Sequence, residues 1–109
     1  MADKPSYRTE RWTKHFEEID KEIAKYASLC RVRLLDPGII QRVLNDDATV
    51  CGKADPSMFR KLRSLLMMHY SVREKAVVTL GPQETLRMVD EIIARLRERY
   101  GDSLGTPGT

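Results

Sequence analysis

Proline divides this chain at three places, and each division comes just before a stretch with helical apolar spacing. The three pairs are Asp36-Pro37, Asp55-Pro56 and Gly81-Pro82. Proline is well tolerated at the first position of a helix, where its missing N–H would have had no partner. Aspartate and glycine both suit the capping position before it. The sequence therefore predicts four helical segments and needs no strand.

The first segment is expected to start between Ser6 and Arg11 and to run to about Leu34. Its apolar residues recur at alternating steps of 4 and 3, which places them on one stripe of a helix; they are Trp12, Phe16, Ile19, Ile23, Tyr26 and Cys30. Charged residues of both signs lie outside this stripe, where we expect a solvated face: Lys14, Glu17, Glu18, Asp20, Lys21, Glu22 and Lys25.

The second segment is short, from Pro37 to about Asn45, and a linker follows it. The third segment starts at Pro56, and we favour a continuous helix to Leu80, with or without a kink, because no Gly or Pro interrupts residues 57–80. The alternatives are a break near Ser71, where Ser71 and Glu74 have the spacing of a capping box, and a short strand over Ala76 to Leu80. Its apolar side is formed by Phe59, Leu62, Leu65, Leu66 and Tyr70.

The fourth segment is expected to start at Pro82 and to stop at Gly101, since glycine is common just after the end of a helix. Its apolar stripe is formed by Leu86, Val89, Ile93, Leu96 and Tyr100. We expect one all-α domain over residues 1–101, a small bundle of four helical segments with the long first and last helices antiparallel. Residues 102–109 are expected to form a disordered tail.

Several classes of protein and site lack support in this sequence. No apolar run approaches the roughly 20 residues that span a membrane, and the N-terminus does not have the pattern of a secretory signal. We therefore expect a cytoplasmic protein without membrane contact. Cys30 and Cys51 lack CxxC spacing and are expected to be structural thiols, with a disulfide between them as the alternative. Neither a metal site nor a cofactor is predicted, because zinc-ligand spacing and phosphate-loop signatures are absent.

Positive charge is concentrated in the third segment. Residues 57–80 carry five basic residues and one acidic residue, a net charge of +4 against +3 for the whole chain. Basic side chains along a helix neutralise phosphates without reading base sequence. With two arginines near the end of the first segment, the candidate nucleic-acid-binding residues are Arg60, Lys61, Arg63, Arg73, Lys75, Arg31 and Arg33. The alternative is that these residues form only a solvated face.

Methionine is frequent in the last two segments, at Met58, Met67, Met68 and Met88. Leu65-Leu66-Met67-Met68 is a run of four apolar residues that must cover more than one face of a helix. Methionine-rich surfaces adapt readily to the shape of a partner. We therefore predict a protein partner or a homo-oligomer, with an interface that contains Leu65, Met67, Met68 and Met58.

One pair of residues suggests chemistry. Arg63 and His69 have the spacing R-x5-H, and Arg8 and His15 have the spacing R-x6-H. These spacings resemble the R-x4-6-H signature of the HEPN ribonucleases, a family of small helical enzymes. The resemblance implies an arginine that binds the scissile phosphate and a histidine that assists proton transfer, in a site completed across a dimer. Without it, His69 is expected to be a partly buried residue at the edge of the core.

The sequence thus favours a small, non-enzymatic binding or assembly subunit. In this interpretation the apolar surface of the third segment binds a protein, and the adjacent basic residues bind nucleic acid. A protein-only adaptor, inhibitor or chaperone is the first alternative. A metal-independent ribonuclease of the HEPN type is the second. No catalytic residue is assigned.

Overall fold

The computed structural model of this chain describes residues 7–53 and 55–105. Four α-helices and two short 3₁₀ helices form the fold, in the order α1 (Tyr7–Cys30), α2 (Ile39–Leu44), η1 (Ala48–Cys51), α3 (Pro56–Leu80), α4 (Pro82–Tyr100) and η2 (Gly101–Leu104). Within those residues no strand is present. The prediction of an all-α bundle is therefore confirmed.

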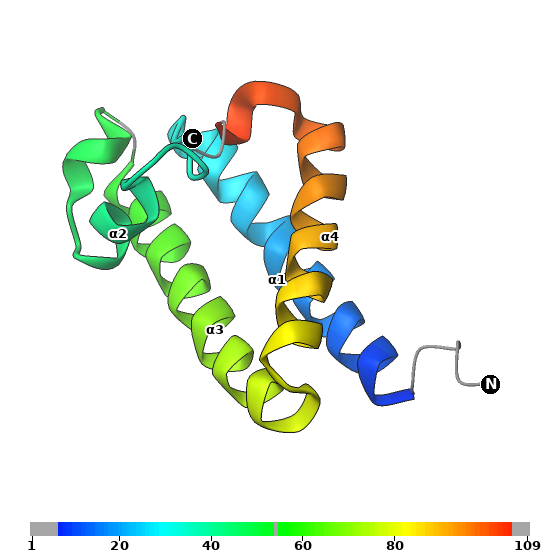
Figure 1. The fold of residues 1–109 in the computed structure, drawn as a ribbon. Helices are drawn as coiled ribbons and strands as arrows, with labels where there is room; N and C mark the ends of the chain where they lie inside the picture. Colours follow the sequence, from blue (N-terminus) through cyan, green and yellow to red (C-terminus); the bar gives the residue numbers. More distant parts are fainter. Residues whose placement is uncertain (1–6, 54, 106–109) are drawn as a thin grey trace.

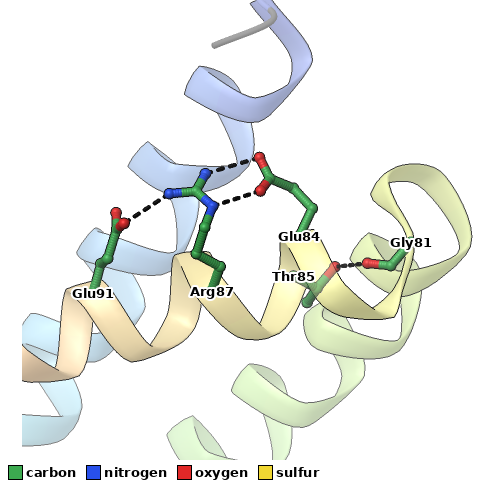
Figure 2. A network of polar contacts seen from close by, with 5 residues as sticks. All are labelled: Gly81, Glu84, Thr85, Arg87 and Glu91. Carbon is green, nitrogen blue, oxygen red and sulfur yellow. Dashed lines mark hydrogen bonds and ion pairs between the residues drawn. The ribbon is translucent and has the colours of Figure 1, made fainter. Parts of the chain in front are cut away.

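The proline-marked starts of α3 and α4 were predicted correctly. Asp55 caps α3, because its carboxylate accepts a hydrogen bond from the Ser57 backbone N–H at 2.9 Å and Pro56 occupies the first turn. α3 then runs without interruption to Leu80, as expected. At the start of α4 the Thr85 hydroxyl donates to the Gly81 carbonyl at 2.8 Å (Figure 2). This bond satisfies the polar group of a side chain that is only 1% exposed.

α1 ends four residues earlier than predicted, at Cys30. Arg31 adopts the left-handed conformation, with φ of 57°. The backbone N–H groups of Arg31 and Val32 then donate to the carbonyls of Ser28 and Ala27 at 3.1 and 2.9 Å. This is the pattern of a Schellman motif, which ends a helix and satisfies its last carbonyls. Sequence reasoning missed the stop because glycine usually occupies the position that Arg31 fills here.

α2 is also shorter than predicted and begins at Ile39 rather than Pro37. Gly38, with φ of 80°, interrupts the helical conformation between the proline and the helix. At its six residues, α2 is roughly 9 Å long. It is therefore too short to cross the bundle, and the described residues make three long passes.

These three passes set the direction of the helices. In Figure 1, α1 and α4 run in the same general direction and α3 runs opposite to both. Two contacts run in the same order along both helices. Glu17 of α1 accepts a hydrogen bond from Arg95 of α4 at 3.1 Å, and further along the chain Leu35, which follows α1, contacts Leu104, which follows α4. The prediction that the first and last helices are antiparallel was therefore wrong. It treated the third segment as a link between two long helices, whereas α3 is a long pass of its own.

The core lies between the three long helices. Of the predicted stripe of α1, Phe16, Ile19, Ile23 and Cys30 are buried, and Trp12 and Tyr26 pack against them. α4 is rotated relative to prediction, because Leu86 is 48% exposed and the buried side is formed by Thr85, Met88, Val89 and Ile92.

The chain after α4 packs against the rest of the fold as far as Gly105. Leu104 is 5% exposed, and its carbonyl accepts a hydrogen bond from the Leu35 N–H at 2.7 Å. A Cβ on Gly105 would lie 2.7 Å from Asp36 Oδ1, so this position needs glycine. The predicted disordered tail from residue 102 was thus wrong for 102–105, because Leu104 has an apolar site to fill. Residues 106–109 lie outside the described residues.

Candidate functional site

One side of α3 is turned away from the rest of the bundle. We call this side the outer face of α3; its exposed residues include Arg60, Lys61, Met67, Met68, Lys75 and Val78. Met67 is 50% exposed, Met68 is 48% exposed and Val78 is 87% exposed. None of the three basic residues forms an ion pair with another described residue. The outer face therefore combines apolar side chains with positive charge, of which that of Arg60 also acts on the nearby Asp55 carboxylate.

Two of the predicted nucleic-acid-binding residues on α3, Arg63 and Arg73, do not lie on the outer face. The Arg63 guanidinium donates to the Leu44 carbonyl at 3.2 Å and lies 4.0 Å from an Asp46 carboxylate oxygen. Arg73 is half-buried, with its guanidinium 5.8 Å from the centre of the Tyr70 ring. Both side chains are held against the bundle by their neighbours, so they do not extend the outer face.

The two arginines after α1 form a separate pair of exposed side chains. Arg31 occupies the left-handed position that ends the helix. Arg33 is paired with Asp36 at 2.9 Å, an exposed ion pair that offsets its charge. Of the seven predicted basic residues, the structure thus brings Arg60, Lys61 and Lys75 together on one face and separates the other four from them.

The predicted protein interface is divided in the same way. Met67 and Met68 are exposed on the outer face, and Met58 is half-buried against the core. Leu65 is 7% exposed and belongs to the core, so its assignment to an interface was wrong. It lies three residues after Leu62 on the buried side of the helix, a spacing that favours the core.

His69 forms a buried polar contact with Asp20. Its Nδ1 lies 2.8 Å from Asp20 Oδ1, and the two residues are 6% and 4% exposed. The ring also meets Phe16 and Tyr70 edge-on, at centroid distances of 5.3 and 5.1 Å. The expectation that Asp20 lies on a solvated face was wrong. Asp20 follows Phe16 by four residues and therefore lies on the buried side of α1.

This pair lies at the edge of a largely apolar cavity of about 80 Å³ between α1, α3 and α4. Asp20 and His69 line it, and Tyr70 and Arg73 of α3 complete its polar lining. Its apolar walls come from all three long helices, from α2, from the chain after α1 and from η2: Ile23, Ala24, Leu34, Leu35, Ile40, Leu66, Ile93, Leu96 and Leu104. Sequence reasoning did not find this cavity, because its walls are far apart along the chain.

The R-x5-H pair does not meet within the chain. Arg63 is directed to the carbonyl of Leu44 in α2, whereas His69 is directed to Asp20 in α1. A step of six residues rotates the second side chain by roughly 240° about the helix axis, which accounts for this separation. The side chain of Arg8 lies outside the described residues. For a HEPN-type site, Arg63 would have to leave the Leu44 carbonyl and His69 would have to leave Asp20.

The two cysteines lie close together although they come from different elements. Cys30, at the end of α1, and Cys51, in η1, are both buried, and their thiols form a hydrogen bond with each other. Burial raises the pKa of Cys30, and it raises the pKa of Cys51 to about 12. Since the thiolate is the reactive form, these thiols are unreactive in the folded protein.

A surface network of charges lies on α4. Arg87 donates to both oxygens of Glu84 at 2.7 and 2.8 Å and to Glu91 at 2.7 Å (Figure 2). The bonds from Arg87 lower the pKa of the Glu84 carboxyl. Arg87 thus links the two carboxylates in one exposed network.

The described residues contain no group of three or more His, Cys, Asp or Glu side chains placed to hold a metal ion. In that part of the chain, too, every helix is too short or too polar to cross a membrane. Comparison with protein-family models, curated proteins and solved structures finds no significant match to this chain.

Proposed function

We propose that this protein is a small, non-enzymatic binding or assembly subunit that works through the outer face of α3. The observation that carries the proposal is the composition of that face, where Met67, Met68 and Val78 lie among basic residues without ion pairs. The apolar side chains would bind a protein partner. The basic side chains would bind nucleic-acid phosphates next to it.

The spacing of the charges suits a phosphate backbone. Arg60 and Lys75 are fifteen residues apart on one continuous helix, a length of roughly 22 Å. At about 3.4 Å per nucleotide, this length matches about six nucleotides of one strand. The three basic side chains of the outer face can therefore contact separate phosphates, which predicts binding without preference for base sequence.

Salt dependence tests the nucleic-acid part of this proposal. Labelled single-stranded and double-stranded nucleic acid is titrated with the protein at several salt concentrations. Three phosphate contacts predict that log K falls against log[salt] with a slope of about −2.7 on duplex DNA and about −2.1 on single strands. The double variant Arg60→Glu/Lys61→Glu should reduce the slope by about 2 or abolish binding.

A matched control separates this face from the effect of net charge. Lys14→Glu/Lys25→Glu changes the net charge by the same amount on exposed positions of α1 and should bind almost as the parent protein does. Equal losses in both double variants, or no binding even at low salt, would contradict the nucleic-acid part. Incubation with RNA in the same samples also measures any cleavage.

The protein-only adaptor is the second candidate, and the exposure of Met67 and Met68 favours it. Met67→Ser/Met68→Ser should weaken self-association or capture of a protein partner, as measured by analytical ultracentrifugation. Leu29→Ser/Leu86→Ser is the control, because Leu29 and Leu86 are 50% and 48% exposed on other helices. Association that depends on the methionines, without any nucleic-acid binding, would favour the adaptor.

A further inference from the structure

The outer face of α3 carries a seven-residue repeat. Seven residues are close to two turns of a helix, so residues at this spacing form rows along the helix axis. Two rows of exposed residues form the edges of the face: Arg60, Met67 and Glu74 on the first edge, and Lys61, Met68 and Lys75 on the second. Between the rows lie Ser64 and Ser71, whose small side chains leave room for a second helix to approach closely. A seven-residue repeat is typical of helices that pack together along their length.

The charges on the first edge are placed symmetrically about a methionine. Arg60 and Glu74 are each seven residues from Met67, on opposite sides of it. Closed protein dimers most often have two-fold symmetry, in which the same surface of both copies meets. When two α3 helices pack antiparallel about such an axis, with their Met67 residues level, Arg60 of each copy lies beside Glu74 of the other. Along this edge the surface is therefore complementary in charge to a second copy of itself.

Both charges are available for this contact. Within the described part of one chain, neither Arg60 nor Glu74 forms an ion pair, and both side chains are exposed. The charge of Arg60 also acts on the nearby Asp55 carboxylate. In the pair of helices, Arg60 gains a second carboxylate, and the charge of Glu74 is offset by an arginine of the other copy.

The direction of packing follows from the distribution of charge along α3. Arg60 and Lys61 lie near the start of the helix, whereas Glu74 and Lys75 offset each other near its end. A parallel pair would gather the Arg60 and Lys61 side chains of both copies at one end. An antiparallel pair divides the same charge equally between the two ends, and its repulsion is lower because repulsion grows with the product of the charges that meet.

We propose that the outer face of α3 binds a second copy of this chain, as an antiparallel helix pair with the methionines at its centre. Met67 and Met68, which are 50% and 48% exposed in the single chain, pack against their counterparts. The proposal rests on the function proposed above, because it names the protein partner of the same face. An interface one helix wide is small, so we expect a weak and reversible dimer.

The second edge of the face acquires a different role in this dimer. There Lys61 of each copy lies beside Lys75 of the other, which gathers four lysines that no single copy has. These like charges oppose the pairing at low salt and suit a phosphate backbone. The first edge thus holds the two copies together, and the second edge is left for nucleic acid.

Reversal of the charges tests the pairing. Analytical ultracentrifugation of the full chain, up to millimolar concentration, measures the dissociation constant of the dimer. Arg60→Glu places two carboxylates side by side at both ends of the pair and should weaken the dimer about tenfold or more. Arg60→Glu/Glu74→Arg restores opposite charges in the reverse order and should return the constant to within about threefold of that of the parent protein. Lys14→Glu makes the same change of charge on an exposed position of α1 and should not weaken the dimer.

Cross-linking of introduced cysteines tests the direction. Both natural cysteines are buried, so a short bismaleimide reacts with an exposed cysteine added to the outer face. Met67→Cys lies beside its counterpart in the antiparallel pair and should cross-link readily. Val78→Cys, which replaces a side chain that is 87% exposed, lies roughly 30 Å from its counterpart along the helix axis in this pair and should not cross-link. In a parallel pair it would cross-link as well.

Three results would overturn the proposal: a monomer at every concentration, a double charge reversal that does not recover the dimer lost in Arg60→Glu, and cross-linking of Val78→Cys as efficient as that of Met67→Cys. All these changes are at exposed positions, and circular dichroism verifies that each variant is folded. A monomer that binds nucleic acid or another protein through the outer face overturns this proposal alone. A dimer of the expected direction that binds no nucleic acid supports it and contradicts the nucleic-acid part of the proposed function.

Discussion

The buried contact between Asp20 and His69 predicts a large and specific loss of stability when one partner is removed. His69→Leu keeps a side chain of similar bulk beside Phe16 and Tyr70 but removes the donor to Asp20 Oδ1. Both carboxylate oxygens of Asp20 then lack a partner, since Oδ2 has none in the parent protein. Asp20 is 4% exposed, so bulk water has little access to its carboxylate.

The expected cost follows from that burial. Leaving a buried polar group without its hydrogen-bond partner costs about 1–3 kcal/mol, and more when that group is charged, which is a sizeable part of the roughly 5–15 kcal/mol that stabilises a domain. Asp20→Asn keeps an acceptor at the position of Oδ1 and should cost less than about 1.5 kcal/mol. Asp20→Leu/His69→Leu removes both polar groups and should cost at least about 2 kcal/mol less than the sum of the two single changes.

Urea unfolding, followed by circular dichroism at 222 nm, measures the free energies of unfolding of the parent protein, Asp20→Asn, the single variants Asp20→Leu and His69→Leu, and the double leucine variant. The m-value must stay constant across the series, so that the differences report stability and not a change in the unfolded state. A cost below about 1 kcal/mol for His69→Leu would refute the reasoning. Additivity of the two single leucine variants within about 0.5 kcal/mol would refute it as well, because independent sites add in this way.

Three further predictions concern single positions. Asp55→Ala should lower the melting temperature at neutral pH. The hydrogen bonds from Ser57 lower the pKa of Asp55 in the folded protein, so the contribution of Asp55 to stability is present above its usual pKa of about 4 and is lost as the pH falls through the lower pKa of the folded state. The melting temperatures of the variant and the parent should therefore converge in acid. Met88→Ala should cost about 2–5 kcal/mol in urea unfolding because Met88 is 2% exposed, whereas Leu86→Ala, at 48% exposed, should cost less than about 1 kcal/mol; similar costs would contradict the orientation of α4. Cys51, whose pKa is raised to about 12, should react with a disulfide reagent at pH 8 only as fast as the protein unfolds, and rapid labelling of the folded protein would contradict its burial.

Local signals predicted the helices better than they predicted the arrangement of the helices. Asp55-Pro56 and Gly81-Pro82 mark true starts, because proline and its capping residue act within one turn of the helix. The end of α1 was missed since Arg31 adopts a conformation that usually indicates glycine. The burial of Thr85 was also missed. The sequence pattern counts threonine as polar and exposed, but a hydroxyl that bonds to the Gly81 carbonyl can be buried.

The candidate sites depended still more on the three-dimensional arrangement. Basic residues along α3 were found from composition, but which of them share a face follows from the contacts of Arg63 and Arg73 with their neighbours. Asp20 and His69 are 49 residues apart in the chain, and no local pattern joins them. Their pairing follows from the packing of α1 against α3, which the spacing of apolar residues predicts only in outline.

The hydrogen bond between Leu35 and Leu104 has a consequence for access to the cavity. Leu34, Leu35 and Leu104 all belong to its walls, and a short 3₁₀ turn near the end of the chain is among the elements that detach from a fold at the lowest free energy. The cavity is already partly open to solvent, and fraying of η2 therefore widens access to it without unfolding the three long helices. The amide of Leu35 reports this event, because it donates to Leu104 and can exchange its hydrogen when η2 detaches. The ratio of its exchange rate to that of an unprotected amide thus sets an upper bound on the fraction of time that η2 is detached.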